Sequence, residues 1–214
     1  MDTLGRDDEL RTIHAFLDSP APGGMAALVL AGEAGIGKST LWLAGVESAR
    51  DRGLHVLSSR PGEVDVGVAH AALGDLLEAA LPDVLPELAG ARRRALETAL
   101  LLGDGPDEPV DGRTLAVAVR NVLQLLAERG PIVLAIDDVQ WLDASSANAL
   151  TFALRRLPDH GIRLLLTHRT TSGSLLTALE RALDDRNLER LHVGQLSPGA
   201  LHAILRDRLG RVFA

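Results

Sequence analysis

The chain has 214 residues, a length that suits one compact domain with at most a short appendage. Apolar residues make up 46% of it and aromatic residues only 2%, so we expect a core of Leu, Val, Ile and Ala. The net charge of −7 and the scarcity of aromatic side chains argue against a domain that binds nucleic acid. The absence of cysteine excludes disulfides and thiol catalysis, and no leader or long apolar run is present, so we expect a cytoplasmic protein that does not enter a membrane.

Helical and strand patterns alternate along the chain. In order, we expect a helix over 7–18, a turn at 19–24, strand 25–31, helix 38–52, strand 54–58, several helices over 60–130 that end with 113–129, strand 131–137, helix 144–157, strand 161–169, helix 175–183, strand 188–193 and a last helix opening at Ser197-Pro198. The polar stretch 103–112 reads as a loop. This alternation predicts one α/β domain over 1–214 with a mostly parallel sheet and helices on both faces. Within it, 1–24 forms an N-terminal helix and linker, and 60–130 a helical insertion between the second and third strands.

The segment from Gly32 to Thr40, called the P-loop below, satisfies the pattern G-x-x-x-x-G-K-[ST] at a predicted strand-to-helix junction. Glycines let successive backbone N–H groups turn toward a phosphate, and the helix start adds positive potential. Lys38 can bring a full charge to the β- and γ-phosphates, and the Ser39 hydroxyl can ligate Mg²⁺. A chance match is the alternative, at roughly one chain in a hundred of this length, but chance would rarely place it at such a junction. We therefore predict an ATP/ADP and Mg²⁺ site that includes Gly32, Glu33, Ala34, Gly35, Ile36, Gly37, Lys38, Ser39 and Thr40.

Polar residues end two other predicted strands. Asp137 and Asp138 follow the third strand, where Asp137 would hold Mg²⁺ through water and Asp138 would orient or deprotonate the attacking water. The simpler interpretation is that two acids begin a solvated turn. Arg169 ends the fourth strand and can clamp a γ-phosphate through its guanidinium, or it can be a surface arginine that pairs with a nearby acid. With the P-loop, Lys38, Asp138 and Arg169 are the predicted catalytic residues, and Ser39 and Asp137 the predicted metal ligands.

Other chemistry-bearing residues carry weaker signals. Gly5 and Arg6 precede an acid-rich first helical turn, and composition alone indicates no more than a loop and a helix start. The seven histidines show no metal-binding spacing. Trp42 lies on the inner face of the helix after the P-loop, where a core position is the simpler interpretation.

Four segments together resemble a known family. They are G-R-D-D-E-L at 5–10, G-E-A-G-I-G-K-S-T at 32–40, V-L-A-I-D-D-V-Q-W-L-D-A-S-S at 133–146 and L-L-L-T-H-R-T at 164–170. They are similar to the ATPase module of large bacterial LuxR-type transcriptional regulators, which are signal-transducing ATPases with numerous domains (STAND) within the AAA-related P-loop class. The resemblance runs from Leu4 to Leu205, and its most specific part is the D-D-x-x-W-x-D pattern from Asp137 to Asp143.

The resemblance implies a three-layer P-loop NTPase fold with strand order 5-1-4-3-2. It also implies that Gly5 and Arg6 lie against adenine and ribose, that Arg169 is the first sensor, and that ATP/ADP exchange with slow hydrolysis acts as a switch, with self-association or regulatory protein partners. Relatives continue into helical, sensor and helix-turn-helix regions, so we expect this chain to be a fragment, a truncated product or a minimal ATPase, with any DNA binding elsewhere. The alternatives are an origin-recognition-like AAA ATPase with sustained turnover and a small-molecule phosphotransferase.

Overall fold

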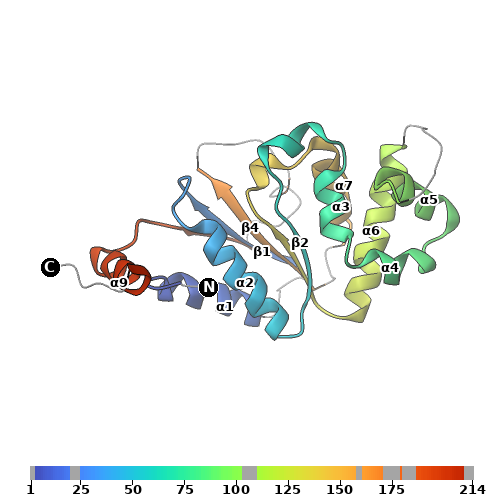
Figure 1. Cartoon of the computed structure of the whole chain (residues 1–214). Helices are drawn as coiled ribbons and strands as arrows, with labels where there is room; N and C mark the ends of the chain where they lie inside the picture. Colours follow the sequence, from blue (N-terminus) through green and yellow to red (C-terminus); the bar gives the residue numbers. More distant parts are fainter. Residues whose placement is uncertain are drawn as a thin grey trace.

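A computed structural model describes residues 3–19, 25–102, 110–157, 161–170, 179 and 187–209. Within these residues, five strands form one sheet in the order β2-β3-β4-β1-β5, and each neighbouring pair is parallel (Figure 1). The predicted order, 5-1-4-3-2, is this order read from the other edge and is confirmed. The strands are β1 (Met25–Gly32), β2 (His55–Ser59), β3 (Ile132–Ile136), β4 (Ile162–Arg169) and β5 (Leu188–His192).

Helices connect the strands in the expected sequence. They are α1 (Asp7–Asp18), α2 (Lys38–Asp51), α3 (Ala71–Leu77), α4 (Leu81–Val84), α5 (Gly90–Ala99), α6 (Gly112–Arg129), α7 (Ala144–Leu154) and α9 (Pro198–Leu209), with short 3-10 turns η1 (Glu63–Gly67), η2 (Leu85–Glu87) and η3 (Val139–Trp141). The expected helix 175–183 lies outside the described residues except for Leu179, and the expected loop 103–112 is described only from residue 110 on.

One predicted boundary was too long, since α7 ends at Leu154 rather than at residue 157. The apolar spacing continues to Leu157, which is buried, but it does so in the turn that follows the helix. Burial alone therefore cannot distinguish the last helical turn from the loop that caps the same core.

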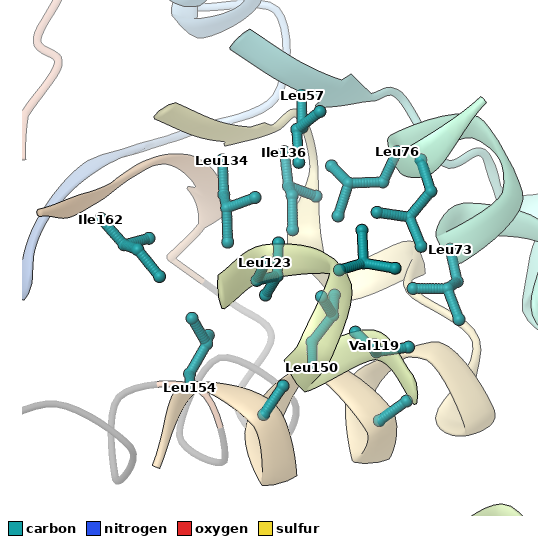
Figure 2. Packing of buried hydrophobic residues seen from close by; sticks show 14 of the residues in the cluster. Leu57, Leu73, Leu76, Val119, Leu123, Leu134, Ile136, Leu150, Leu154 and Ile162 are labelled. Atoms are coloured by element: carbon teal, nitrogen blue, oxygen red, sulfur yellow. The ribbon is translucent and has the colours of Figure 1, made fainter. Parts of the chain in front are cut away.

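Helices cover the sheet on both faces. On one face, α1 and α2 pack through Ile13, Leu41 and Trp42 against strand residues such as Leu28, Val133 and Leu165. On the other, α3, α6 and α7 pack against the alternate residues of the same strands, and Figure 2 shows Leu76 of α3 and Leu123 of α6 next to Ile136 and Leu134. Because β3 is buried on both faces, its sequence reads as a continuous apolar run, whereas β4, although equally buried, also carries Arg163, Thr167 and His168.

The elements between β2 and β3 form the helical part that the sequence predicted as an insertion. Its longest member, α6, begins at an Asp111 carboxylate that accepts the Thr114 N–H at 2.9 Å, an N-cap that fixes where the helix starts. In the part of the chain that the structure describes, no helix is both long and apolar enough to span a bilayer.

Candidate functional site

The predicted site residues lie at one edge of the sheet because parallel strands end on the same side. The register pairs Gly32 at the end of β1 with Arg169 at the end of β4, and Ile136 at the end of β3 with Leu166. Asp137 and Asp138 therefore follow β3 beside the P-loop. The topology thus brings together the P-loop, the two aspartates after β3 and Arg169 at the end of β4.

The P-loop depends on glycine at two positions. Gly35 and Gly37 have φ angles of +75° and +105°, in the region that other residues rarely adopt. Gly37 is the N-cap of α2, so the first N–H groups of this helix, which have no partners within it, open toward the loop. This arrangement is suited to anions.

Lys38 is almost fully buried, with 5% of its surface exposed. Its Nζ donates to the carbonyl oxygens of Gly32 at 3.1 Å and Glu33 at 2.8 Å, which closes the loop on itself. Burial lowers the pKa of the Lys38 ammonium, against the opposing charge of Asp138, and Arg169 lowers it further. Lys38 is the only lysine in the chain.

Asp137 lies beneath the P-loop, 4% exposed. Its Oδ1 accepts hydrogen bonds from the hydroxyls of Ser39 at 3.2 Å and Thr167 at 2.7 Å. Its Oδ2 lies 3.5 Å from Nε of Arg60. The two predicted metal ligands, Ser39 and Asp137, are therefore in direct contact.

Asp138 adopts a left-handed conformation with φ +51°, which is strained for a residue with a side chain. Its N–H donates to the Thr167 hydroxyl at 2.6 Å. Its carboxylate accepts from Nε2 of Gln140 at 2.8 Å and lies 3.5 Å from a guanidinium nitrogen of Arg169. Arg169 also lies over the ring of Trp141, 5.6 Å from its centre.

A cavity of about 300 Å³ joins these groups, and its volume is at the lower limit for a small-molecule site. Its lining residues are Ala34, Gly35, Gly37, Lys38, Ser39, Thr40, Asp138 and Arg169. Gly5 and Arg6 do not reach it. Arg6 lines a second cavity of about 160 Å³, which shares only Gly37 and Thr40 with the first.

Two residues of the site were missed by the sequence analysis. Thr167 is fully buried, and its hydroxyl bridges the Asp137 carboxylate and the Asp138 N–H. Arg60 pairs with Asp137, and its guanidinium carbon lies over the Trp42 ring, 6.0 Å from the ring centre. Their only sequence signal was position, since each lies at the carboxyl end of a strand next to β3.

The end of the D-D-x-x-W-x-D pattern acts through backbone contacts. The buried Asp143 caps α7 by accepting the Ser146 N–H at 2.9 Å and also accepts the N–H groups of His70 at 2.9 Å and Ala72 at 3.3 Å.

Trp42 lies in the core, as expected, and its indole N–H donates to the Leu165 carbonyl at 3.2 Å. No cluster of three or more His, Asp or Glu side chains that could hold a metal occurs in the described ranges.

A parallel sheet in this order with a glycine-rich strand-to-helix loop defines a P-loop NTPase. The family model described as "AAA ATPase domain" matches residues 3–167, and the chain belongs to this family. It is thus a nucleotide-binding ATPase module.

An uncharacterized protein of Rhizobium meliloti (strain 1021) is 28% identical over an alignment of 200 residues, and the match covers 80% of this chain and 19% of that protein. The chain thus corresponds to about a fifth of that relative. Among solved structures, Drosophila ORC bound to DNA has a TM-score of 0.58 at 18% identity, with 96% of this chain and 47% of that one covered. AMPPCP-bound DnaA from Aquifex aeolicus has a TM-score of 0.50 at 15% identity, with 96% and 51% covered. At these identities the likeness shows the fold alone.

Proposed function

We propose that this chain is a nucleotide switch: it binds ATP with Mg²⁺, hydrolyses it slowly and serves a LuxR-type transcriptional regulator of the STAND group. The observation that carries this proposal is the shared cavity of Lys38, Ser39, Asp138 and Arg169, with Asp137 in contact with Ser39. Lys38 and the first N–H groups of α2 would hold the phosphates. Arg169 would read the γ-phosphate.

The residues present fit Mg²⁺. This ion prefers oxygen ligands, keeps several waters and usually takes only one or two protein groups together with substrate phosphates. The Ser39 hydroxyl and the Asp137 carboxylate, 3.2 Å apart, are such a pair. The bound ion would offset phosphate charge.

The contacts of Asp138 support slow rather than sustained turnover. A general base must reach the proton of the attacking water, yet both carboxylate oxygens of Asp138 already face donors, Gln140 and Arg169. A water that Asp138 orients would have to share these two oxygens with the donors already there. The regulatory assignment itself rests on the LuxR-like motifs, above all the segment from Asp137 to Asp143.

The test combines binding and turnover with the 214-residue chain. Binding of a fluorescent ATP analogue with Mg²⁺ should be lost in Lys38→Ala, because a charge-assisted contact worth about 1.5–3 kcal/mol is removed. Asp138→Asn should bind like the parent and release phosphate more slowly. Asp111→Asn, which also replaces a carboxylate with an amide but at the exposed cap of α6, is the matched control and should match the parent in both assays.

Phosphate release also separates the alternatives. A switch should turn over slowly, with bound ADP accumulating. Fast multiple turnover would favour a motor-like AAA ATPase, and transfer of label to an added nucleoside or sugar would favour a phosphotransferase. Binding that persists unchanged in Lys38→Ala would contradict the site itself.

A further inference from the structure

Arg6 is a buried arginine, with 7% of its surface exposed, and it lies outside the cavity of about 300 Å³ lined by Lys38 and Asp138, called the phosphate cavity below. Its guanidinium makes three hydrogen bonds within the chain. Nη1 donates to the Glu9 carboxylate at 2.8 Å and to the Gly194 carbonyl at 2.8 Å, and Nη2 donates to the Ile36 carbonyl at 2.7 Å. Three acceptors in a fork geometry hold the guanidinium in one position.

The three acceptors belong to segments far apart in the chain. Glu9 lies in the first turn of α1, Ile36 in the P-loop, and Gly194 in the segment between β5 and α9. The N-terminal segment can lie this close to α9 only because residue 5 is glycine, since a Cβ on Gly5 would lie 2.2 Å from the Cβ of Ala200. Arg6 is thus the point at which the N-terminal segment, the P-loop and the chain after β5 are joined.

The contact with Ile36 has a direct consequence for the next residue. In a trans peptide, the carbonyl of one residue and the N–H of the next point in opposite directions. When Arg6 holds the Ile36 carbonyl on one side of the P-loop, it orients the Gly37 N–H toward the other side. Gly37 lines the phosphate cavity.

We propose that Arg6 is a positioning residue that sets the phosphate-facing N–H of Gly37 by holding the Ile36 carbonyl, and that it does not read the base. This proposal rests on the proposed nucleotide function and deepens it. A guanidinium that turned toward a base would have to give up contacts of 2.7–2.8 Å with charged and carbonyl acceptors.

The two roles differ in which ligands they affect. Binding of ATP, GTP and inorganic tripolyphosphate, each with Mg²⁺, is measured by calorimetry on the full chain. If Arg6 acts by positioning the P-loop, Arg6→Ala should weaken the binding of all three ligands by a similar factor, about ten- to a hundredfold. Arg11→Ala is the matched control in α1, the helix that Arg6 precedes, since Arg11 is exposed and pairs with Asp8; it should stay within about twofold of the parent.

A second variant and a second readout distinguish positioning from general loss of structure. Glu9→Gln keeps the side-chain shape but weakens its hold on Arg6, and should give a smaller loss in the same uniform pattern. In amide NMR spectra of either variant, the Gly37 N–H resonance should shift while those of β3 stay in place.

The outcomes are separable. A loss confined to ATP would mean that Arg6 contacts adenine and would overturn the proposal, as would unchanged binding or an unmoved Gly37 resonance in Glu9→Gln. If Arg6→Ala does not fold, Glu9→Gln carries the test alone. If the parent chain binds none of the three ligands, the nucleotide function fails first and the role of Arg6 fails with it.

Discussion

Replacing Thr167 with valine removes one hydroxyl from the centre of the site and keeps the side-chain shape. That hydroxyl donates to Asp137 at 2.7 Å and accepts the Asp138 N–H at 2.6 Å, and the side chain is fully buried. The variant therefore leaves the partly buried Asp138 N–H without this partner and removes a hydrogen bond from the Asp137 carboxylate.

Each loss has a known magnitude. An unsatisfied buried donor costs about 1–3 kcal/mol, and a hydrogen bond to a charged group contributes about 1.5–3 kcal/mol. Burying one more methyl group returns about 0.8 kcal/mol. We expect Thr167→Val to lower the free energy of unfolding by about 2–5 kcal/mol, a large fraction of the stability of a typical domain.

Urea denaturation of the 214-residue chain without nucleotide measures this change, provided that the slope of the transition stays constant. Thr167→Ser keeps the hydroxyl and loses the methyl, so it should cost only about 1 kcal/mol. A double-mutant cycle with Asp137→Asn should show coupling above about 0.5 kcal/mol. The reasoning is refuted if the valine variant is as stable as the serine variant, or if the two sites are additive.

Three further predictions test other parts of the structure. Gly45→Ala should lower stability by about 1–3 kcal/mol in thermal or urea unfolding, since its Cβ would lie 2.7 Å from Cδ2 of Leu165. The hydrogen bond from Thr114 lowers the pKa of the Asp111 carboxyl below 3.8, so the stability that this carboxylate adds is present above that pH and is lost on acidification. The free energy of unfolding should therefore fall less between pH 5 and pH 2 in Asp111→Asn than in the parent, as measured by circular dichroism. Although burial lowers the pKa of Lys38, its Nζ is covered and bonded to two carbonyls, so an amine-reactive reagent at alkaline pH should modify it slowly; ATP with Mg²⁺ should slow the modification further, as peptide mass spectrometry would show.

Much of the fold could be predicted from the sequence because its signals are local. Buried parallel strands such as β3 read as unbroken apolar runs, and Gly and Pro divide the helices between them. The strand order came from the resemblance, since periodicity says nothing about which strands are neighbours. The P-loop was recognisable because its spacing follows from backbone geometry within a few residues.

The contacts that complete the site could not be predicted, because they depend on the register between strands. Thr167 meets Asp137 only because β3 and β4 pair Ile136 with Leu166, which places their next residues side by side. Arg60 meets Asp137 for the same reason across β2 and β3. The Gly194 partner of Arg6 lies 188 residues along the chain, beyond any local pattern.

The charged groups around the cavity are all paired with other groups of the chain. The ammonium of Lys38 is held by two carbonyls, Asp137 contacts Arg60, and Asp138 contacts Arg169. In the proposed switch, a nucleotide whose phosphates engaged Lys38 and Arg169 would compete with the present partners of these two side chains, which lie in the P-loop and after β3. Such competition would couple nucleotide binding to the position of the P-loop and of Asp138, which the proposed switch requires.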